Sequence, residues 1–189
     1  MLLVNLYGAP GAGKSTGATY IFSQLKMAGI NAEYVSEFAK DKVWERSQAV
    51  FENQAYIFGK QYFRISRIGD QVDVIVTDSP LLLCAYYNND PVLGKAFDET
   101  VASVARSYNQ LNFFVGRVKA YNPKGRFQTE AQSDQVAGEL LEALEYWKVP
   151  IWHIDGDTEG YDKAIGVIKG RLANPLMNKP NNVDGGWLN

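Results

Sequence analysis

Short apolar runs alternate with longer amphipathic stretches along the 189 residues of this chain. The short runs are rich in aliphatic and β-branched side chains and predict five strands, at residues 2–7, 32–36, 72–77, 111–116 and 150–154. The amphipathic stretches predict helices at residues 14–27, 44–68, 92–108, 130–147 and 160–172, and the second is long enough to be two helices. This alternation is typical of βαβ units. We therefore expect an α/β fold in which a five-stranded parallel sheet lies between two layers of helices.

The composition is that of one globular domain. Hydrophobic residues make up 46% of the chain and charged residues 21%, and its length suits a single core. We expect the domain to span residues 1–172 and to be followed by a mobile tail, residues 173–189, which is rich in Pro, Asn and Gly. The 19 Lys and Arg against 21 Asp and Glu give a formal net charge of −2. Any site for a polyanion must therefore be local.

Two absences in the sequence bear on where the protein works. No apolar run approaches the roughly 20 residues needed to cross a bilayer, and residues 1–7 lack the basic start of a secretory signal. Cys84 is the single cysteine, which excludes an internal disulfide, and with one histidine there is no soft-ligand zinc cluster to propose. We expect a cytoplasmic protein in a reducing compartment.

The strongest motif lies where the first predicted strand meets the first predicted helix. Residues 8–15 read Gly-Ala-Pro-Gly-Ala-Gly-Lys-Ser and match the phosphate-binding pattern G-x-x-x-x-G-K-[ST]. Glycines let the backbone curl so that N–H groups face phosphate oxygens at the positive end of a helix dipole. We expect Lys14 to reach the β- and γ-phosphates of ATP and the Ser15 hydroxyl to bind Mg²⁺. The predicted nucleotide contacts are Gly8, Ala9, Pro10, Gly11, Ala12, Gly13, Lys14, Ser15 and Thr16.

Two acids follow predicted strands and should face the same crevice. Asp78 ends the apolar run that starts at Val72, where an acid in P-loop proteins lies beside Mg²⁺. Glu37 follows the second predicted strand, and the carboxyl ends of parallel strands open onto one crevice. Asp78 can hold Mg²⁺ through water or take the proton of an acceptor hydroxyl, and Glu37 can act as the general base. The structural alternatives are a cap for the turn at Ser79 and a surface glutamate near Lys40.

A basic stretch precedes the fourth predicted helix. Residues 100–129 contain no Asp or Glu, and the cations of this stretch are Arg106, Arg117, Lys119, Lys124 and Arg126. We expect residues 117–129 to form a lid over the triphosphate, with Arg126 first and Arg117 second as the group that neutralises charge during phosphoryl transfer. A solvated loop, or a surface for a nucleic-acid backbone, would have the same composition.

The predicted helix at residues 44–68 allows two interpretations. Its aromatic residues, Tyr56, Phe58, Tyr62 and Phe63, fit either a core or the stacking of an acceptor base. Gln54 and Gln61 lie seven positions apart, hence on one helix face, where they would read a base edge or face solvent. His153, at the end of a predicted strand, is expected to pack or cap and not to act as a catalyst.

These residues together resemble a known family. The P-loop with Ser15, the Glu37-Phe38-Ala39-Lys40 step and Asp78-Ser79-Pro80 are similar to the nicotinamide-riboside-kinase-type (NadR-type) P-loop kinases, which include compact phage enzymes. Residues 121–130 resemble the lid entrance of phage members that phosphorylate 5-hydroxymethyluracil in DNA. The resemblance covers residues 1 to about 170 and implies the strand order 2-3-1-4-5. It also implies that Asp155 and Gly156 lie beside the adenine ring, although this turn would equally serve to cap the last helix.

The implied activity is transfer of the γ-phosphoryl group of ATP to a hydroxyl of a nucleoside-type acceptor. The preferred acceptor is the 5-hydroxymethyl group of 5-hydroxymethyluracil in phage DNA, which would place the protein in the host cytoplasm. A kinase of a free nucleoside or nucleoside monophosphate, nicotinamide riboside included, would use the same core with a more closed acceptor pocket. An ATPase or nucleotide-dependent switch is the non-kinase alternative and would need a water-positioning residue at Glu37.

Overall fold

A computed structural model describes residues 1–40, 48–122 and 129–174 of the chain. The five strands are β1 (Leu2–Tyr7), β2 (Ala32–Val35), β3 (Val74–Thr77), β4 (Asn109–Gly116) and β5 (Trp152–Asp155). They form one sheet in the order β2-β3-β1-β4-β5, and every neighbouring pair is parallel. The predicted sheet and its strand order are confirmed.

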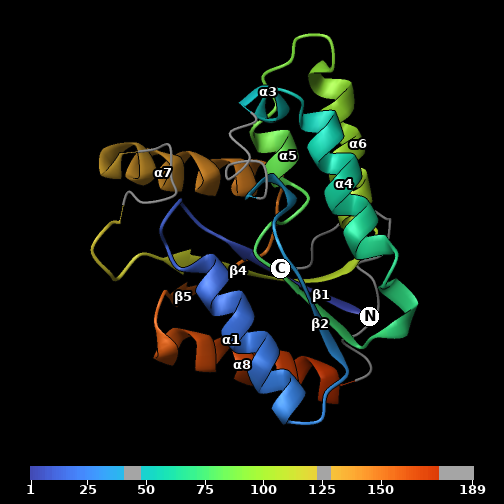
Figure 1. Ribbon diagram of the computed structural model, residues 1–189, viewed down its shortest axis with the longest axis vertical. Coiled ribbons are helices and arrows are strands. Elements are labelled where there is room, and N and C mark those ends of the chain that lie inside the picture. The colour runs from blue at the N-terminus through green and yellow to red at the C-terminus, as the bar shows by residue number, and fades with distance from the viewer. Residues whose placement is uncertain (41–47, 123–128, 175–189) are drawn as a thin grey trace.

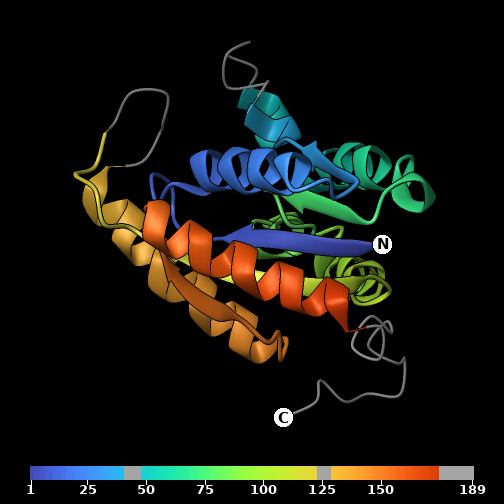
Figure 2. The same ribbon diagram turned by 90° about the horizontal axis from the view of Figure 1, so that it is seen from below.

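Helices cover both faces of this sheet (Figure 1). The α-helices are α1 (Lys14–Met27), α3 (Gln48–Phe51), α4 (Gln54–Ser66), α5 (Leu83–Tyr86), α6 (Gly94–Arg106), α7 (Glu130–Tyr146) and α8 (Thr158–Ala173), and a 3₁₀ turn, η1, spans Gly69–Gln71. Helices α1 and α8 lie on one face, in front of β1 in Figure 2, while α4, α5, α6 and α7 lie on the other. The result is the three-layer α/β sandwich expected from the sequence.

The central strand β1 shows why the core has two halves. All six of its residues are buried, because helices cover the sheet on both sides. Successive side chains of a strand point to opposite faces, so Leu2, Val4 and Leu6 pack toward α1 and α8. Leu3 and Tyr7 pack toward the helices of the opposite layer. This arrangement holds the carboxyl end of β1, from which the P-loop leaves, in the middle of the molecule.

Strand β4 begins at Asn109, two residues earlier than the predicted strand at 111–116. The two missed residues, Asn109 and Gln110, are polar but buried, and they pair with β1 in the sheet. Asn5 Nδ2 donates to Gln110 Oε1 at 2.9 Å and to Asn112 Oδ1 at 2.8 Å. A search for apolar runs misses such positions, because buried amides are stable where they bond to one another.

The helical stretch predicted at residues 44–68 is divided in the part that the structure describes. Helix α3 ends at Phe51, and α4 begins after Asn53, whose side chain caps it by accepting from the N–H of Tyr56 at 2.9 Å. The short helix α5 was not predicted. Residues 41–47 and the tail from residue 175 lie outside the described residues, so the expectation of a mobile tail is not tested. None of the described helices is long and apolar enough to span a bilayer.

Candidate functional site

The P-loop turns on residues whose backbone conformation and close contacts require glycine. Gly8 has a φ of 141°, and a Cβ there would lie 2.7 Å from the carbonyl oxygen of Val115. Gly13 has a φ of 103°, and a Cβ there would lie 2.5 Å from the hydroxyl of Tyr161. Other residue types rarely adopt such φ values. The loop therefore packs against β4 on one side and α8 on the other.

Three elements hold the P-loop from outside. Ser133 on α7 donates its hydroxyl to the carbonyl of Pro10 at 2.7 Å, and Tyr161 on α8 donates to the carbonyl of Gly13 at 3.0 Å. The turn between β5 and α8 completes the support, because a Cβ at Gly156 would lie 2.2 Å from the carbonyl oxygen of Ala12. The loop is thus pre-organised by residues far from it in sequence.

The amino end of α1 is built for an anion. Its N-cap residue is Gly13, which offers no side-chain acceptor, so no side chain of the described residues caps the first turn. The first N–H groups of a helix have no partner within the helix and carry the positive end of its dipole. Lys14 Nζ donates to the carbonyls of Gly8 at 2.7 Å and Ala9 at 3.1 Å, which places its ammonium across the mouth of the loop.

Asp78 lies buried at the carboxyl end of β3, where its side chain meets the loop that follows β2. It is 2% exposed, and its Oδ1 accepts from the backbone N–H of Glu37 at 3.1 Å. Burial raises the pKa of the Tyr34 hydroxyl, and the charge of Asp78 and a side-chain hydrogen bond with it raise that pKa further. Asp78 does not accept from the N–H of Ser79 in the turn that follows it, because this N–H donates to Thr77 Oγ1 at 3.1 Å. Asp78 therefore faces the neighbouring strand end.

Glu37 is half-buried and lies where its charge reaches α5. Burial raises the pKa of Cys84 to about 12, and the charge of Glu37 is the second cause. The same two causes, in the same order, raise the pKa of Tyr87 to about 12. Since Glu37 also adds to the raised pKa of Tyr34, its carboxylate lies among groups from β2 and from the α5 region. Tyr34, Cys84 and Tyr87 thus form the wall around the Glu37 carboxylate.

Lys40 is a site residue that sequence reasoning named only as a neighbour of Glu37. Its Nζ lies 3.4 Å from Ser15 Oγ, the predicted Mg²⁺ ligand of the P-loop. The short segment of residues 37–40 therefore contacts Asp78 at its first residue and Ser15 at its last. In the sequence, the only sign that Lys40 belongs to the site was its position three residues after an acid at a predicted strand end.

Gln61 holds this segment in place, and its expected role is corrected. It is 1% exposed, so it neither faces solvent nor reads a base edge as predicted. Its Oε1 accepts from the N–H of Phe38 at 3.0 Å, and its Nε2 donates to Ser36 O and to Thr77 Oγ1, each at 3.4 Å. Gln54 is also buried and donates to the carbonyl of Phe51 at 2.9 Å. Of these two glutamines, Gln61 is the one that ties α4 to the strand ends that carry the acids.

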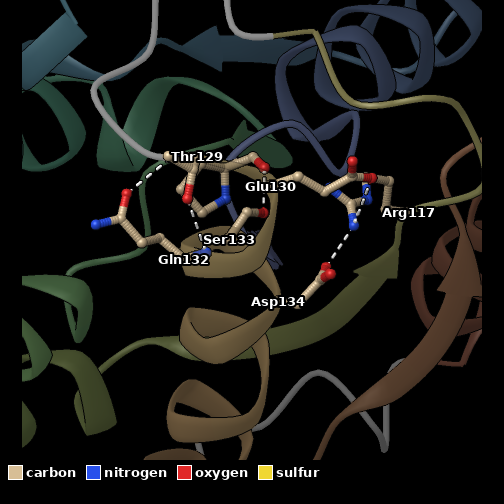
Figure 3. A network of polar contacts seen from close by, with 7 residues as sticks. Arg117, Thr129, Glu130, Gln132, Ser133 and Asp134 are labelled. Carbon is tan, nitrogen blue, oxygen red and sulfur yellow. Dashed lines mark hydrogen bonds and ion pairs between the residues drawn. The ribbon is translucent and has the colours of Figure 1, made fainter.

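In the described part of the predicted lid, the side chain of Arg117 contacts α7 (Figure 3). Arg117 pairs with Asp134 and, at 3.4 Å, with Glu130, so acids from the next helix neutralise a stretch that is acid-free in sequence. Its side chain is 16% exposed, and its guanidinium lies 5.3 Å from the ring centroid of Tyr121. Thr129 and Gln132 form a capping box that starts α7. Arg126 lies outside the described residues, and its role stays a prediction.

Two small depressions flank the carboxyl end of β4. One, of about 170 Å³, borders the P-loop and is lined by Ala9, Ala12, Phe114, Val115, Gly116, Arg117, Ser133, Asp134 and Ala137. The other, of about 220 Å³, is lined by Phe114, Gly116, His153, Ile154, Asp155 and Lys163. The cap of α8 is Asp157, which accepts from the N–H of Gly160 at 2.9 Å. Asp155 is thus left on the surface of the second depression. His153 is exposed there, against the ring of Phe114.

The oxygen groups at the site fit Mg²⁺ better than a softer metal. Ser15 offers a hydroxyl and Asp78 a buried carboxylate, and Mg²⁺ prefers such hard oxygen ligands while keeping water and phosphate oxygens in its other positions. Among the described residues, no group of three or more His, Cys, Asp or Glu is placed to hold a metal. A site of two protein ligands completed by a nucleotide is what this arrangement fits.

Comparison with known proteins agrees with this geometry. A family described as an AAA domain matches residues 3–160, which covers the P-loop, both acids and all five strands apart from the first residue of β1. A search of curated proteins finds no match. The order of the strands, the uncapped helix behind the P-loop and this match lead to one conclusion: the chain belongs to the AAA domain family and has the fold of a nucleotide-binding P-loop NTPase.

Proposed function

We propose that this protein is an ATP-dependent kinase that transfers the γ-phosphoryl group to a hydroxyl of a nucleoside-type acceptor. The observation that carries this proposal is the segment of residues 37–40, which contacts Asp78 at one end and Ser15 at the other. An acid from a second strand end thereby lies beside the predicted metal ligands. Phosphoryl transfer to a hydroxyl needs such a group, because the attacking oxygen must be oriented and must lose its proton.

The roles follow from position and charge. The N–H groups at the start of α1 and the ammonium of Lys14 bind the phosphates, and Ser15 and Asp78 hold Mg²⁺. When bound, Mg²⁺ supplies neutralisation of charge on the phosphate oxygens. Glu37 accepts the proton of the acceptor hydroxyl, since it follows β2 at the edge of the sheet where the P-loop leaves β1. Arg126 and, after release from α7, Arg117 add positive charge at the transferred group.

The acceptor that we propose is the 5-hydroxymethyl group of 5-hydroxymethyluracil in DNA. The resemblance of residues 121–130 to the lid entrance of phage kinases supports this choice. The wall near Glu37 supports it as well, because Tyr87 is an aromatic side chain, 38% exposed, within electrostatic reach of that carboxylate. A base in a duplex would have to leave the stack to reach this wall, at a cost of a few kcal/mol. Nicotinamide riboside or another free nucleoside remains the second candidate of the same class.

The test offers three acceptors side by side with labelled ATP: duplex DNA that contains 5-hydroxymethyluracil, the free nucleoside and its monophosphate. Label in the DNA supports the proposal in full. Label in a small acceptor but never in DNA removes the DNA acceptor and keeps the kinase. Phosphate release with no labelled acceptor indicates the ATPase or switch.

The two acids are separated by a second measurement. Glu37→Gln should lower kcat by about 10²- to 10⁴-fold with little change in ATP binding, whereas Asp78→Asn should shift the magnesium titration. If Asp78→Asn leaves the titration unchanged and abolishes the rate, the two roles are exchanged.

A further inference from the structure

Helix α4 carries a stripe of exposed aromatic and basic side chains on its outer face. Tyr56, Lys60, Phe63 and Arg67 recur at intervals of four, three and four residues, so they share one face of the helix and its C-cap. Tyr56 is 41% and Phe63 62% exposed, and Lys60 and Arg67 are exposed as well. We call these four residues the α4 stripe. Core packing, which was one interpretation of the aromatic residues, does not account for Tyr56 and Phe63.

The charge of the stripe is of one sign. Helix α4 contains no Asp or Glu, and Glu52 and Asp70 flank it only beyond its two ends. Among the described residues, no ion pair includes Lys60 or Arg67. Lys60 instead lies 5.4 Å from the ring centroid of Tyr56. On a chain whose formal net charge is −2, this is a local basic surface suited to a polyanion.

The stripe leads to the candidate base. The ring of Tyr56 meets that of Phe38 edge-on, with 5.5 Å between centroids, and Phe38 follows Glu37 in sequence. Arg64, on the flank of the stripe, lies over the same Phe38 ring at 5.2 Å and donates to the carbonyl of Ser36 at 3.2 Å. Figure 1 shows α4 beside α6 in the outer layer of helices. A ligand lying along the stripe therefore reaches the loop that carries Glu37.

We propose that the α4 stripe binds single-stranded nucleic acid, with Lys60 and Arg67 on phosphates and Tyr56 and Phe63 stacked on bases. Alternating cations and exposed rings fit this ligand, because each nucleotide presents one charge and one aromatic face. An acidic protein segment would use the cations but would leave the rings without a function. Binding of a single strand does not depend on the proposed function. Only the further statement that the bound strand is also the phosphoryl acceptor rests on it. In that case the stripe would hold the nucleotides next to the flipped or unpaired base that is phosphorylated.

The binding test uses a fluorescein-labelled oligothymidylate and measures anisotropy over a range of salt concentrations. Phe63→Ala should weaken binding about tenfold, the order expected for the loss of one stacked base. Lys60→Ala and Arg67→Ala should each lower the slope of log affinity against log salt by about 0.7, the value for one phosphate contact on a single strand. The matched controls are Tyr146→Ala on α7 and Lys169→Ala on α8, which remove an exposed ring and an exposed cation away from the stripe.

Each outcome decides between the stripe and an alternative. Equal losses in the stripe variants and the controls would overturn the proposal. Polyglutamate that competes as well as the oligonucleotide, with no effect of Phe63→Ala, would show a surface for acidic protein instead. If DNA is phosphorylated but the stripe variants bind it normally, the stripe proposal fails and the kinase proposal stands. If no acceptor is phosphorylated but the stripe variants bind more weakly, the kinase proposal fails and the stripe proposal stands.

Discussion

The backbone N–H of Glu37 donates to Asp78 Oδ1 at 3.1 Å, which joins the chain after β2 to the end of β3 across 41 positions of sequence. The bond needs only a carbonyl-type oxygen on residue 78. Asp78→Asn therefore keeps an acceptor for Glu37 while it removes the negative charge. For this reason the effect of Asp78→Asn on magnesium dependence reports the charge and not a collapsed loop.

Lys14→Ala should leave the fold intact and lower phosphoryl transfer by about 10²- to 10³-fold, because the ammonium faces the phosphate-binding loop and not the core. Circular dichroism and turnover with the labelled acceptor are measured together. Lys26→Ala, at the other end of α1, is the control and should retain full turnover. Unchanged turnover in Lys14→Ala would contradict the P-loop assignment.

Gln61→Leu should lower the free energy of unfolding by about 1–3 kcal/mol, because the N–H of Phe38 loses its buried acceptor. It should also lower kcat more than it raises KM for ATP, since the segment that carries Glu37 is released. Gln54→Leu is the matched control, because Gln54 is also a buried residue of α4 but, among the described residues, its side chain bonds only to Phe51. Urea unfolding and steady-state kinetics check both effects. A stability loss with unchanged kcat would show that Gln61 does not position Glu37.

The Cys84 thiol should make the stability of the protein fall in alkali. Burial and the charge of Glu37 raise its pKa from 9.0 to about 12. Because the folded state holds the proton more tightly, the contribution is fully present below pH 9 and is lost as pH rises toward 12. The difference in unfolding free energy between the native protein and Cys84→Ala isolates this effect from the tyrosines. That difference should shrink over the window, and a constant difference would contradict it.

Glu37→Gln supplies a second test of the same pair of residues. It should lower the pKa of the Cys84 thiol, which would still stay above 9 because burial is the larger cause. The pH dependence of alkylation by a small reagent measures this pKa. An unchanged value would place the Glu37 carboxylate away from α5.

Two glycine substitutions should act in opposite directions. Gly156→Ala should destabilise by about 1–3 kcal/mol and weaken ATP binding, because its Cβ would lie 2.2 Å from the carbonyl oxygen of Ala12 in the P-loop. Gly166→Ala, inside α8 with nothing within 4 Å of the added Cβ, should stabilise by about 0.5–1 kcal/mol. Thermal unfolding and nucleotide titration separate them. Similar melting temperatures for the two variants would refute the tight contact at Gly156.

The local pattern of the chain was enough to predict the sheet and the nucleotide-binding loop. Short apolar runs specify parallel strands because both faces of the sheet are buried, and the P-loop motif is contiguous, so its spacing is visible in one dimension. The positions of Asp78 and Glu37 near strand ends were also predicted this way, since the ends of parallel strands meet at one edge. Strand order came from resemblance to a known family, and the structure confirms it.

The contacts between distant segments were decided only by the tertiary structure. Gln61 was expected to read a base edge or to face solvent, yet packing of α4 on the sheet buries it against Phe38 and Thr77. Arg117 lies in an acid-free stretch, but the placement of α7 brings Asp134 to it. Lys40 meets Ser15 only because β2 and β1 end at the same edge of the sheet. Side-chain partners depend on where helices pack, and hydrophobic periodicity gives the face of a helix but not its neighbour.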